Sequence, residues 1–169
     1  ADLFPGARVL ESGVGSGALS TTILRAIGSS GHLLGYELRP EFAEKAQQNV
    51  TAFLGPDQPF DIEIRSSYDG IDAADLDRVI LDLPEPWQVV PHAEKALHPG
   101  GILVCYLPTI TQVARLHEAL ADSAFGLVET IEVLNRSWHV EGLSVRPDHR
   151  MVAHTGFLTH ARLLRSDPV

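Results

Sequence analysis

The sequence predicts an α/β fold with a doubly wound, mostly parallel sheet and a C-terminal antiparallel hairpin. Two observations lead to this class. Apolar β-type segments alternate with helical patterns over most of the chain, and the last two β-rich segments have no helix between them. Strands joined through helices lie parallel with right-handed crossovers, whereas neighbouring strands without a helix pair antiparallel. With 169 residues, 44% of them hydrophobic, we expect one domain over residues 1–169.

The first half of the chain is expected to hold three strands and two helices. Gly28 ends the first helical pattern, while Pro40 and Gly55 mark the start and the end of the second. The expected strands cover residues 7–12, 32–37 and 60–66, and the helices cover 18–28 and 39–55, with Leu19, Ile23, Ala26 and Ile27 on the buried face of the first helix.

The second half continues the alternation and then changes character. Two β-rich segments, 127–140 and 151–165, close the chain, and we expect a loop between them that contains Arg146, Pro147 and Asp148. Before them we expect strands over 76–83 and 102–108, a helix and a Pro-Gly-Gly turn over 89–101, and a helix over 111–123.

Charge is distributed unevenly along the chain, whose net charge is −9. Residues 1–135 hold 8 Lys/Arg against 19 Asp/Glu, a net −11, whereas residues 136–169 hold 5 Arg against 3 acids, a net +2. Contact with a polyanion is therefore expected through the C-terminal part, a further domain or a partner subunit. The alternative is an acidic protein with no such contact.

The location of the protein is expected to be cytoplasmic, without membrane contact. No apolar run is long enough to cross a membrane, nothing resembles a signal peptide, and the one cysteine cannot form an internal disulfide. Because a strand begins within the first ten residues, we also expect that an N-terminal segment is missing from the sequence.

Three glycines, Gly13, Gly15 and Gly17, follow the first strand at alternate positions. A tight turn needs one or two glycines, so three indicate that something lies close against the backbone. A turn between a first strand and its helix lies at the carboxyl edge of a Rossmann-like sheet, where ligands bind. The alternative is a glycine-rich surface turn without a ligand.

Two acids flank this turn and favour one type of ligand. Glu37, about twenty residues further on at a strand end, is placed to accept hydrogen bonds from two ribose hydroxyls. The turn itself fits both the dinucleotide pattern G-x-G-x-x-G/A and the methyltransferase pattern E-x-G-x-G-x-G. Glu11 favours the second, because it would attract the sulfonium and amino groups of S-adenosylmethionine and repel a pyrophosphate.

A second candidate site is "LDLPEPW", which follows the fourth strand and brings Asp82 to the same sheet edge. Pro84 and Pro86 stiffen the loop, and Trp87 offers a flat face. A carboxylate and an aromatic ring suit a planar base, which donates from its amine and stacks. Taken alone, the loop also fits a proline-capped strand end with Trp87 in the core.

Other reactive residues carry weaker signals. Cys105 lies in an apolar strand and is expected in the core. Ser16 lacks the outer glycines of a hydrolase nucleophile elbow. Arg146 and Arg150 suit either phosphate contact or a solvated loop. Four histidines match no compact ligand spacing, so we expect no metal site and assign them to polar or RNA-facing surface: His139, His149, His154 and His160.

These motifs together resemble the class I S-adenosylmethionine-dependent methyltransferases, and more narrowly the tRNA adenine-N1 methyltransferases that modify adenosine 58 in the T-loop. The similarity runs over nearly the whole chain, and "DLPEPW" and "HTGFL" are its most particular points. The matching stretches are "VLESGVGSGALS", "GYELRPEFAEKAQQNV", "DRVILDLPEPW", "GGILVCYLPTITQV" and "VRPDHRMVAHTGFLTHARLL".

The resemblance implies roles for individual residues. Asp82 would be the catalytic acid facing the target adenine, and Glu37 would hold the cofactor ribose. The implied cofactor-binding set is Glu11, Gly13, Gly15, Ser16, Gly17, Ala18, Leu19, Glu37, Leu38, Ser67 and Asp82, and the implied substrate-binding set is Pro84, Trp87, Tyr106 and His154.

The chain departs from the family pattern in several places. Ser12 and Val14 replace residues that are usually Ala and Thr or Ala. Ser66 and Ser67 stand where many methyltransferases have an acid for the cofactor adenine, which leaves that contact open. The small N-terminal β domain of the family, which helps bind tRNA, has no counterpart in the sequence. The family also implies a homo-oligomer, usually a tetramer.

The expected function is methyl transfer from S-adenosylmethionine to N1 of adenosine in the tRNA T-loop. One alternative is a non-catalytic RNA-binding subunit beside an active partner, against which the intact Glu37, Asp82 and glycine turn argue. Another is a methyltransferase for a different substrate. A nicotinamide oxidoreductase fits least well, because Glu11 would repel a pyrophosphate.

Overall fold

The computed structural model describes residues 1–151 and 153–164. Seven strands form its central sheet in the order β3–β2–β1–β4–β5–β9–β6. Strands β1 to β5 are parallel, while β9 runs antiparallel to both β5 and β6. The predicted doubly wound α/β sheet is thus confirmed. The strands are β1 (Arg8–Ser12), β2 (His32–Glu37), β3 (Phe60–Ile64), β4 (Leu76–Leu81), β5 (Leu97–Leu107), β6 (Phe125–Glu132) and β9 (Phe157–Leu163).

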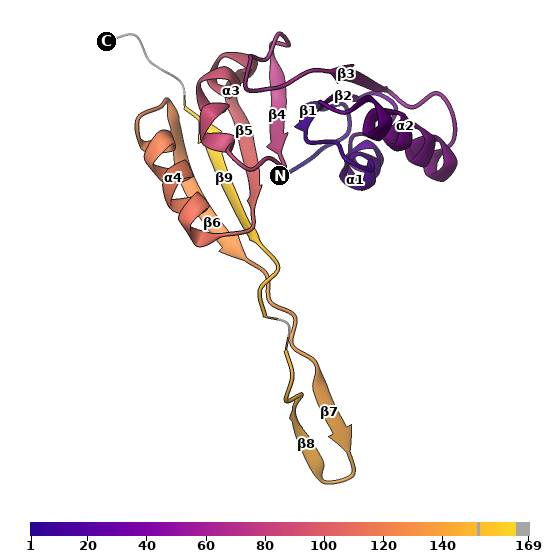
Figure 1. Ribbon diagram of the computed structural model, residues 1–169, viewed down its shortest axis with the longest axis vertical. Helices are drawn as coiled ribbons and strands as arrows, with labels where there is room; N and C mark the ends of the chain where they lie inside the picture. Colours follow the sequence, from indigo (N-terminus) through magenta and orange to yellow (C-terminus); the bar gives the residue numbers. More distant parts are fainter. Residues whose placement is uncertain (152, 165–169) are drawn as a thin grey trace.

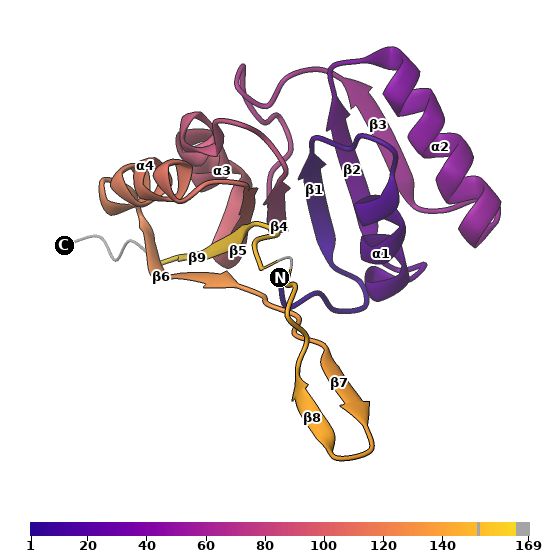
Figure 2. The same ribbon diagram turned by 60° about the horizontal axis from the view of Figure 1, so that its bottom comes forward.

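The helices cover the two faces of the sheet unequally (Figure 2). On one face, α1 (Ala18–Ile27) and α2 (Pro40–Leu54) pack on the β1–β2–β3 side. On the other, α3 (Val90–Ala96) and α4 (Ile110–Ala121) cover β4, β5, β9 and β6, and a short 3-10 turn, η1 (Pro86–Gln88), precedes α3. None of the helices in the described residues is long and apolar enough to cross a membrane.

The buried face of α1 differs from the prediction at three positions, because Leu24 is buried, Leu19 is exposed and Ala26 is only half-buried. Leu24 is buried beside Ile23 and Ile27, whereas Leu19 is 39% exposed. Leu19 lies in the first turn of the helix, beyond the part that packs on the sheet, so the expectation that it faces the core was wrong.

The C-terminal strands correct a second expectation. The predicted antiparallel pairing of the last two β-rich segments is present, with Thr130 opposite Thr159, but β9 lies between β5 and β6 and makes β6 the edge strand. The second segment was predicted over 151–165; its strand is β9, and residues 152 and 165 lie outside the described part of the chain.

Between β6 and β9 the chain forms a separate two-stranded hairpin, which projects from the body of the molecule (Figure 1). Its strands are β7 (Trp138–Glu141) and β8 (Ser144–Pro147), and we call residues 138–147 the hairpin arm. Arg146 and Pro147 therefore lie in a strand rather than in the predicted loop, and Asp148 follows it. The β-rich segment predicted over 127–140 thus contains β6 and β7 with a break between them.

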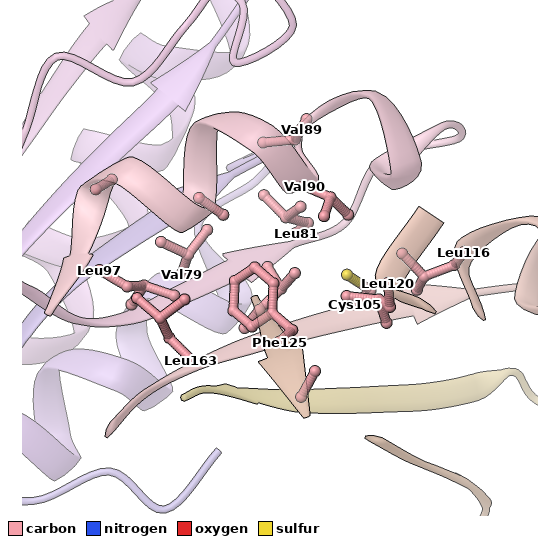
Figure 3. Packing of buried hydrophobic residues seen from close by; sticks show 14 of the residues in the cluster. Val79, Leu81, Val89, Val90, Leu97, Cys105, Leu116, Leu120, Phe125 and Leu163 are labelled. Atoms are coloured by element: carbon pink, nitrogen blue, oxygen red, sulfur yellow. The ribbon is translucent and has the colours of Figure 1, made fainter. Parts of the chain in front are cut away.

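One hydrophobic core lies between α3, α4 and the sheet (Figure 3). Val79 and Leu81 of β4 contact this cluster from the sheet, and Leu116 and Leu120 contact it from α4. Cys105 is fully buried there, and burial raises the pKa of its thiol, so the expectation of a core cysteine is confirmed.

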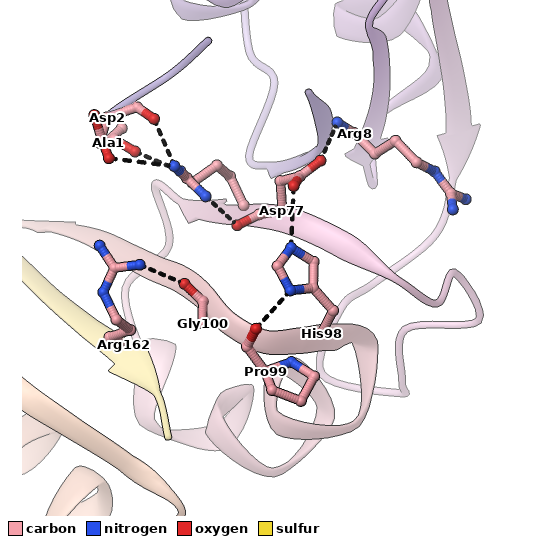
Figure 4. Close-up of polar contacts among 9 residues, drawn as sticks. Ala1, Asp2, Arg8, Asp77, His98, Pro99, Gly100 and Arg162 are labelled. Atoms are coloured by element: carbon pink, nitrogen blue, oxygen red, sulfur yellow. Dashed lines mark hydrogen bonds and ion pairs between the residues drawn. The ribbon is translucent and has the colours of Figure 1, made fainter. Parts of the chain in front are cut away.

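A polar network ties together the amino ends of β1, β4 and β5 (Figure 4). Asp77 accepts a hydrogen bond from the Arg8 N–H at 2.8 Å and pairs with His98 at 3.0 Å. The buried Arg78 donates to the carbonyl oxygens of Ala1 and Asp2, each at 2.6 Å. These contacts hold β1 against β4 at the end of the sheet opposite the glycine turn.

Candidate functional site

A cavity of about 430 Å³ lies at the carboxyl ends of β1 to β4. The strand order reverses there, because the chain runs from β1 outward to β3 and then returns to β4 on the other side of β1. Open α/β sheets bind ligands at such a point. The cavity is lined by Ser12, Gly13, Gly15, Tyr36, Glu37, Leu38, Arg39, Arg65, Ser66, Ser67, Tyr68, Asp82, Leu83 and Pro84.

The three glycines of the turn differ in how much space a side chain would have at each position. A Cβ on Gly13 would lie 2.3 Å from the carbonyl oxygen of Asp82, and a Cβ on Gly17 would lie 3.0 Å from the Cα of Ala46 in α2. At Gly15 the nearest atom to a missing Cβ is the Gly13 carbonyl oxygen at 4.0 Å, and the residue has a φ of +54°. Two glycines are therefore required by the packing of the protein itself, and the third suits the left-handed backbone of the turn.

Glu37 connects the turn to the end of β2. Its Oε2 accepts the Gly15 N–H at 2.9 Å, and its Oε1 accepts the Arg39 N–H at 3.1 Å. Burial alone would raise the pKa of Glu37, but these hydrogen bonds outweigh it and hold the pKa below its usual range. Glu37 is therefore an ionised carboxylate on the cavity wall at neutral pH.

Glu11 lies beneath the turn and is only 1% exposed. Its Oε2 accepts a hydrogen bond from Ser20 Oγ at 2.6 Å, while its Oε1 is buried without a partner in the described chain. Burial, opposed by the Ser20 hydrogen bond and reinforced by the nearby Asp82, raises the pKa of Glu11 to about 7. This buried carboxyl group with one free oxygen therefore attracts a hydrogen-bond donor or a cation.

Asp82 follows β4 and is held to β1 through its backbone, because its N–H donates to the Ser12 carbonyl at 3.0 Å. Partial burial raises the pKa of its carboxyl group. On the floor of the same cavity, Ser12 Oγ donates to Ser67 Oγ at 2.9 Å, which joins the ends of β1 and β3.

Asp82 also lines a second cavity, of about 480 Å³. The wall of this cavity is mostly apolar and includes Leu19, Tyr106 and Leu158. Asp82 is thus shared by two cavities, of which the first has more charged and hydroxyl-bearing residues in its wall. The second cavity is lined by Ala1, Leu3, Leu19, Thr22, Ile23, Ile80, Leu81, Asp82, Val104, Tyr106 and Leu158.

The site residues predicted from the sequence lie in several different places in the structure. Glu11 lies under the glycine turn, and neither Trp87 nor His154 lines either cavity. The second cavity contains Leu19, Tyr106 and Asp82. A separate groove between α1 and α2 is lined by Ser16, Gly17 and Ala18. The first cavity brings together the remaining predicted residues, which are Gly13, Gly15, Glu37, Leu38, Ser67, Asp82 and Pro84.

Trp87 and His154 are fixed by contacts of their own. Trp87 packs against the core, and the guanidinium of Arg115 lies 4.3 Å from the centre of its ring. His154 bonds to Glu132 and to the carbonyl oxygen of Pro108.

Several lining residues were not predicted. Arg65 follows β3 and lies 4.8 Å from the centre of the Tyr36 ring, and it forms an ion pair with Asp72. Tyr36 is fully buried in β2 and also lines the first cavity. The signal that could have found them is position, since Tyr36, Arg39, Arg65 and Tyr68 all stand at or just after the ends of parallel strands. No three His, Cys, Asp or Glu side chains among the described residues gather as a metal site would require.

Comparison with known proteins agrees with this geometry. The sequence is 37% identical over 183 aligned residues to the tRNA (adenine(57)-N(1)/adenine(58)-N(1))-methyltransferase TrmI of Methanocaldococcus jannaschii, covering 94% of this chain and 65% of the relative. It is 41% identical to the tRNA (adenine(58)-N(1))-methyltransferase TrmI of Thermus thermophilus, covering 95% of this chain and 63% of the relative. The chain thus spans less than two thirds of the length of these curated relatives.

The fold matches a SAM-dependent O-methyltransferase from Thermotoga maritima with a TM-score of 0.91 and 34% identity, over 99% of this chain and 63% of that one. The profile of one family, described as the tRNA methyltransferase complex GCD14 subunit, matches residues 1–146. Because that match covers most of the sequence, the chain belongs to the GCD14 family of tRNA methyltransferase subunits.

Proposed function

We propose that this chain is the catalytic domain of an S-adenosylmethionine-dependent tRNA (adenine-N1)-methyltransferase that acts on adenosine 58 of the T-loop in the cytoplasm. The observation that carries the proposal is Asp82, which lines both cavities. A transferase that joins a cofactor to a base needs two binding sites that meet at the reacting atoms. The first cavity, with its charged and hydroxyl-bearing residues, suits the cofactor, and the more apolar second cavity suits the base.

The first cavity fits S-adenosylmethionine by the chemistry of its donors. Glu37 is ionised, and carboxylate oxygens retain lone pairs for the ribose hydroxyls after accepting two backbone N–H groups. Glu11 and Asp82 place two carboxyl groups with raised pKa values around the turn, and a bound amino group or sulfonium would favour their ionised forms. Gly13, Gly15, Leu38 and Ser67 would complete the contacts, and Leu38 offers an exposed apolar side chain for the adenine.

When bound, S-adenosylmethionine supplies an electrophilic methyl group. The residues of this chain then have to orient the base and stabilise charge, because N1 of adenine carries a free lone pair near neutral pH and needs no strong base. Asp82 accepts a hydrogen bond from the 6-amino group and stabilises the positive charge that grows on the base, a contribution of ~2–4 kcal/mol. Tyr106 lines the base cavity, and Pro84 holds the loop that carries Asp82.

The test is methyl transfer from labelled S-adenosylmethionine to unmodified tRNA by the full-length protein, with the product nucleoside identified by mass spectrometry. Asp82→Ala is expected to lower kcat by roughly 10²–10³-fold. The dissociation constant of the cofactor, measured by calorimetry, should change little, because Glu37 and the glycine turn remain. Equal loss of turnover and cofactor affinity would argue against the role of Asp82.

The same experiment separates the alternatives. Absence of N1-methyladenosine from the unmodified wild type would refute the proposed reaction. The Thermotoga relative is named an O-methyltransferase, and a product methylated on oxygen would indicate that chemistry instead. Binding of tRNA without any methyl transfer would indicate a non-catalytic subunit.

We also propose that the protein self-associates through the hairpin arm. The register places four apolar residues on one face of the arm, and Trp138 is 59% exposed there. An isolated two-stranded hairpin is marginally stable in water, so this face favours a partner. A second copy fits by charge, since residues 136–150, which contain the arm, hold 3 Arg against 2 acids, a net +1, whereas residues 1–135 carry a net −11. The apolar face consists of Trp138, Val140, Val145 and Pro147.

A further inference from the structure

The segment that returns from the hairpin arm to β9 lies against Tyr106. The Tyr106 hydroxyl donates to the carbonyl oxygen of Thr155 at 2.6 Å. A Cβ on Gly156 would lie 2.3 Å from a ring atom of Tyr106, so only glycine lets the ring occupy its place. Residues 154–156 therefore form the outer support of the ring that lines the second cavity.

His154 holds this segment in place. Its Nδ1 lies 2.8 Å from Glu132 Oε1 at the end of β6, and its Nε2 lies 2.6 Å from the carbonyl oxygen of Pro108, just after β5. Both partners are acceptors, so both ring nitrogens must donate, which requires the imidazolium form. The Glu132 carboxylate, followed by the Pro108 carbonyl, raises the pKa of His154, which agrees with this geometry.

The position of His154 separates it from any bound base. It lines neither cavity, whereas Tyr106, which contacts the next two residues, lines the second one. The ring of His154 instead packs against Phe157, with centroids 5.1 Å apart. His154 is therefore connected to the cavity only indirectly, through the contacts that residues 155 and 156 make with Tyr106.

We propose that His154 is a positioning residue that sets the Tyr106 ring against the acceptor base, rather than a residue that contacts the substrate. By joining the ends of β5 and β6 to the return segment, it fixes the distance between Thr155 and the Tyr106 hydroxyl. The reading of the second cavity as the acceptor site rests on the proposed function, but the coupling between His154 and Tyr106 does not.

The coupling is tested first without any substrate. The chain has three tyrosines, so labelling with 3-fluorotyrosine should give three fluorine resonances, each assigned by a Tyr→Phe variant. His154→Ala is expected to shift or broaden the Tyr106 resonance alone. Glu132→Ala removes the other side of the same contact and should act in the same way, which covers the case in which one variant folds poorly.

His160→Ala is the matched control. His160 lies in β9, and its ring, like that of His154, bonds to a carboxylate, that of Glu129, at 3.0 Å, a contact that involves β6 and not residues 154–156. It should leave all three resonances in place. An unchanged Tyr106 resonance in both His154→Ala and Glu132→Ala would overturn the proposal.

The functional consequence is tested by a double-mutant cycle in the full-length protein. His154→Ala is expected to lower kcat/KM for tRNA about ten-fold, with no change in cofactor affinity. In a Tyr106→Ala background the same change should have little further effect, because the ring that it positions is gone. An equal loss in both backgrounds would show that His154 acts directly on tRNA and would overturn the proposal. Failure of the wild type to methylate tRNA would refute the proposed function, while the fluorine experiment would still decide the coupling.

Discussion

The glycine turn and the hairpin arm differ in what determines their shape. At the turn, Gly13 and Gly17 pack against the backbone of neighbouring elements, and Glu37 is bonded to the chain on both of its oxygens. The arm has an exposed apolar face and projects from the body (Figure 1). The proposed cofactor site is therefore shaped by the chain itself, whereas the apolar face of the arm is left exposed in the described part of the chain.

Gly13→Ala should cause the largest loss of stability and of cofactor binding, because Gly13 is the most tightly packed residue of the turn. The new Cβ would lie 2.3 Å from the Asp82 carbonyl oxygen, and the residue would have to keep a φ of +90°. Strain and overpacking together should lower the free energy of unfolding by roughly 3–5 kcal/mol. Denaturant unfolding measures this loss, and calorimetry should show cofactor binding lost as well.

Gly142→Ala is the control for that change in the arm. Gly142 has a φ of +55° with no atom near its missing Cβ, so only the backbone cost of about 1–2 kcal/mol applies, and it falls on the arm alone. Cofactor affinity should stay at the wild-type value. Comparable losses of affinity in the two variants would contradict the distinction between the two regions.

Glu11→Gln should have the next largest effect, and its sign depends on pH. The folded-state pKa of Glu11 is raised from 4.5 to about 7, so its contribution to stability is complete below pH 4.5 and is lost as the pH rises to about 7. Above pH 7, the free protein carries an ionised buried carboxylate that costs about 3 kcal/mol. Removing the charge should therefore stabilise the free protein at pH 8 and change little at pH 4.5.

Melting temperatures of the wild type and Glu11→Gln between pH 4.5 and 8 test this prediction. The two curves should separate as the pH rises, with the variant more stable at the alkaline end. Cofactor affinity should change in the opposite direction, because a cationic ligand loses an ionised partner. Parallel melting curves would mean that Glu11 is not strained in the free protein.

The sequence predicted the N-terminal half more closely than the C-terminal half, for a physical reason. Strands β1, β2 and β4 are largely buried, and amphipathic helices follow β1 and β2, so the hydrophobic pattern marks these strands in the sequence. The arm lies outside the seven-stranded sheet, and three polar residues, Asn135, Arg136 and Ser137, separate it from β6. The prediction joined the apolar residues on both sides of this polar break into one β-rich segment, because nothing local shows that the second part forms a hairpin of its own.

Within the site, the sequence predicted which residues stand at the strand ends, but not where their side chains point. Glu11 and Glu37 both stand at strand ends, yet Glu11 turns under the glycine turn toward Ser20 while Glu37 reaches Gly15. His154 was expected at the substrate, but its partners, Glu132 and Pro108, come from segments more than twenty residues away. Contacts of that range depend on how β5, β6 and β9 pair, which composition and spacing do not encode.

Changes on the apolar face of the arm should have the smallest effect on the body of the protein. Trp138→Ser with Val140→Ser removes apolar surface that no described element covers, so the free energy of unfolding of the body should stay within about 0.5 kcal/mol. Light scattering should show a lower mass in solution than for the wild type, because the self-association proposed for this face needs both residues.

Changes on the opposite face separate a protein partner from RNA. His139→Ser with Arg146→Ser leaves the apolar face intact, so the mass in solution should be unchanged, while loss of a positive charge would weaken a phosphate contact. If the Trp138 variant kept the wild-type mass and lost tRNA affinity instead, the arm would be an RNA-binding element. The arm would then still differ from the glycine turn in needing a partner, but that partner would be tRNA rather than a second copy of the chain.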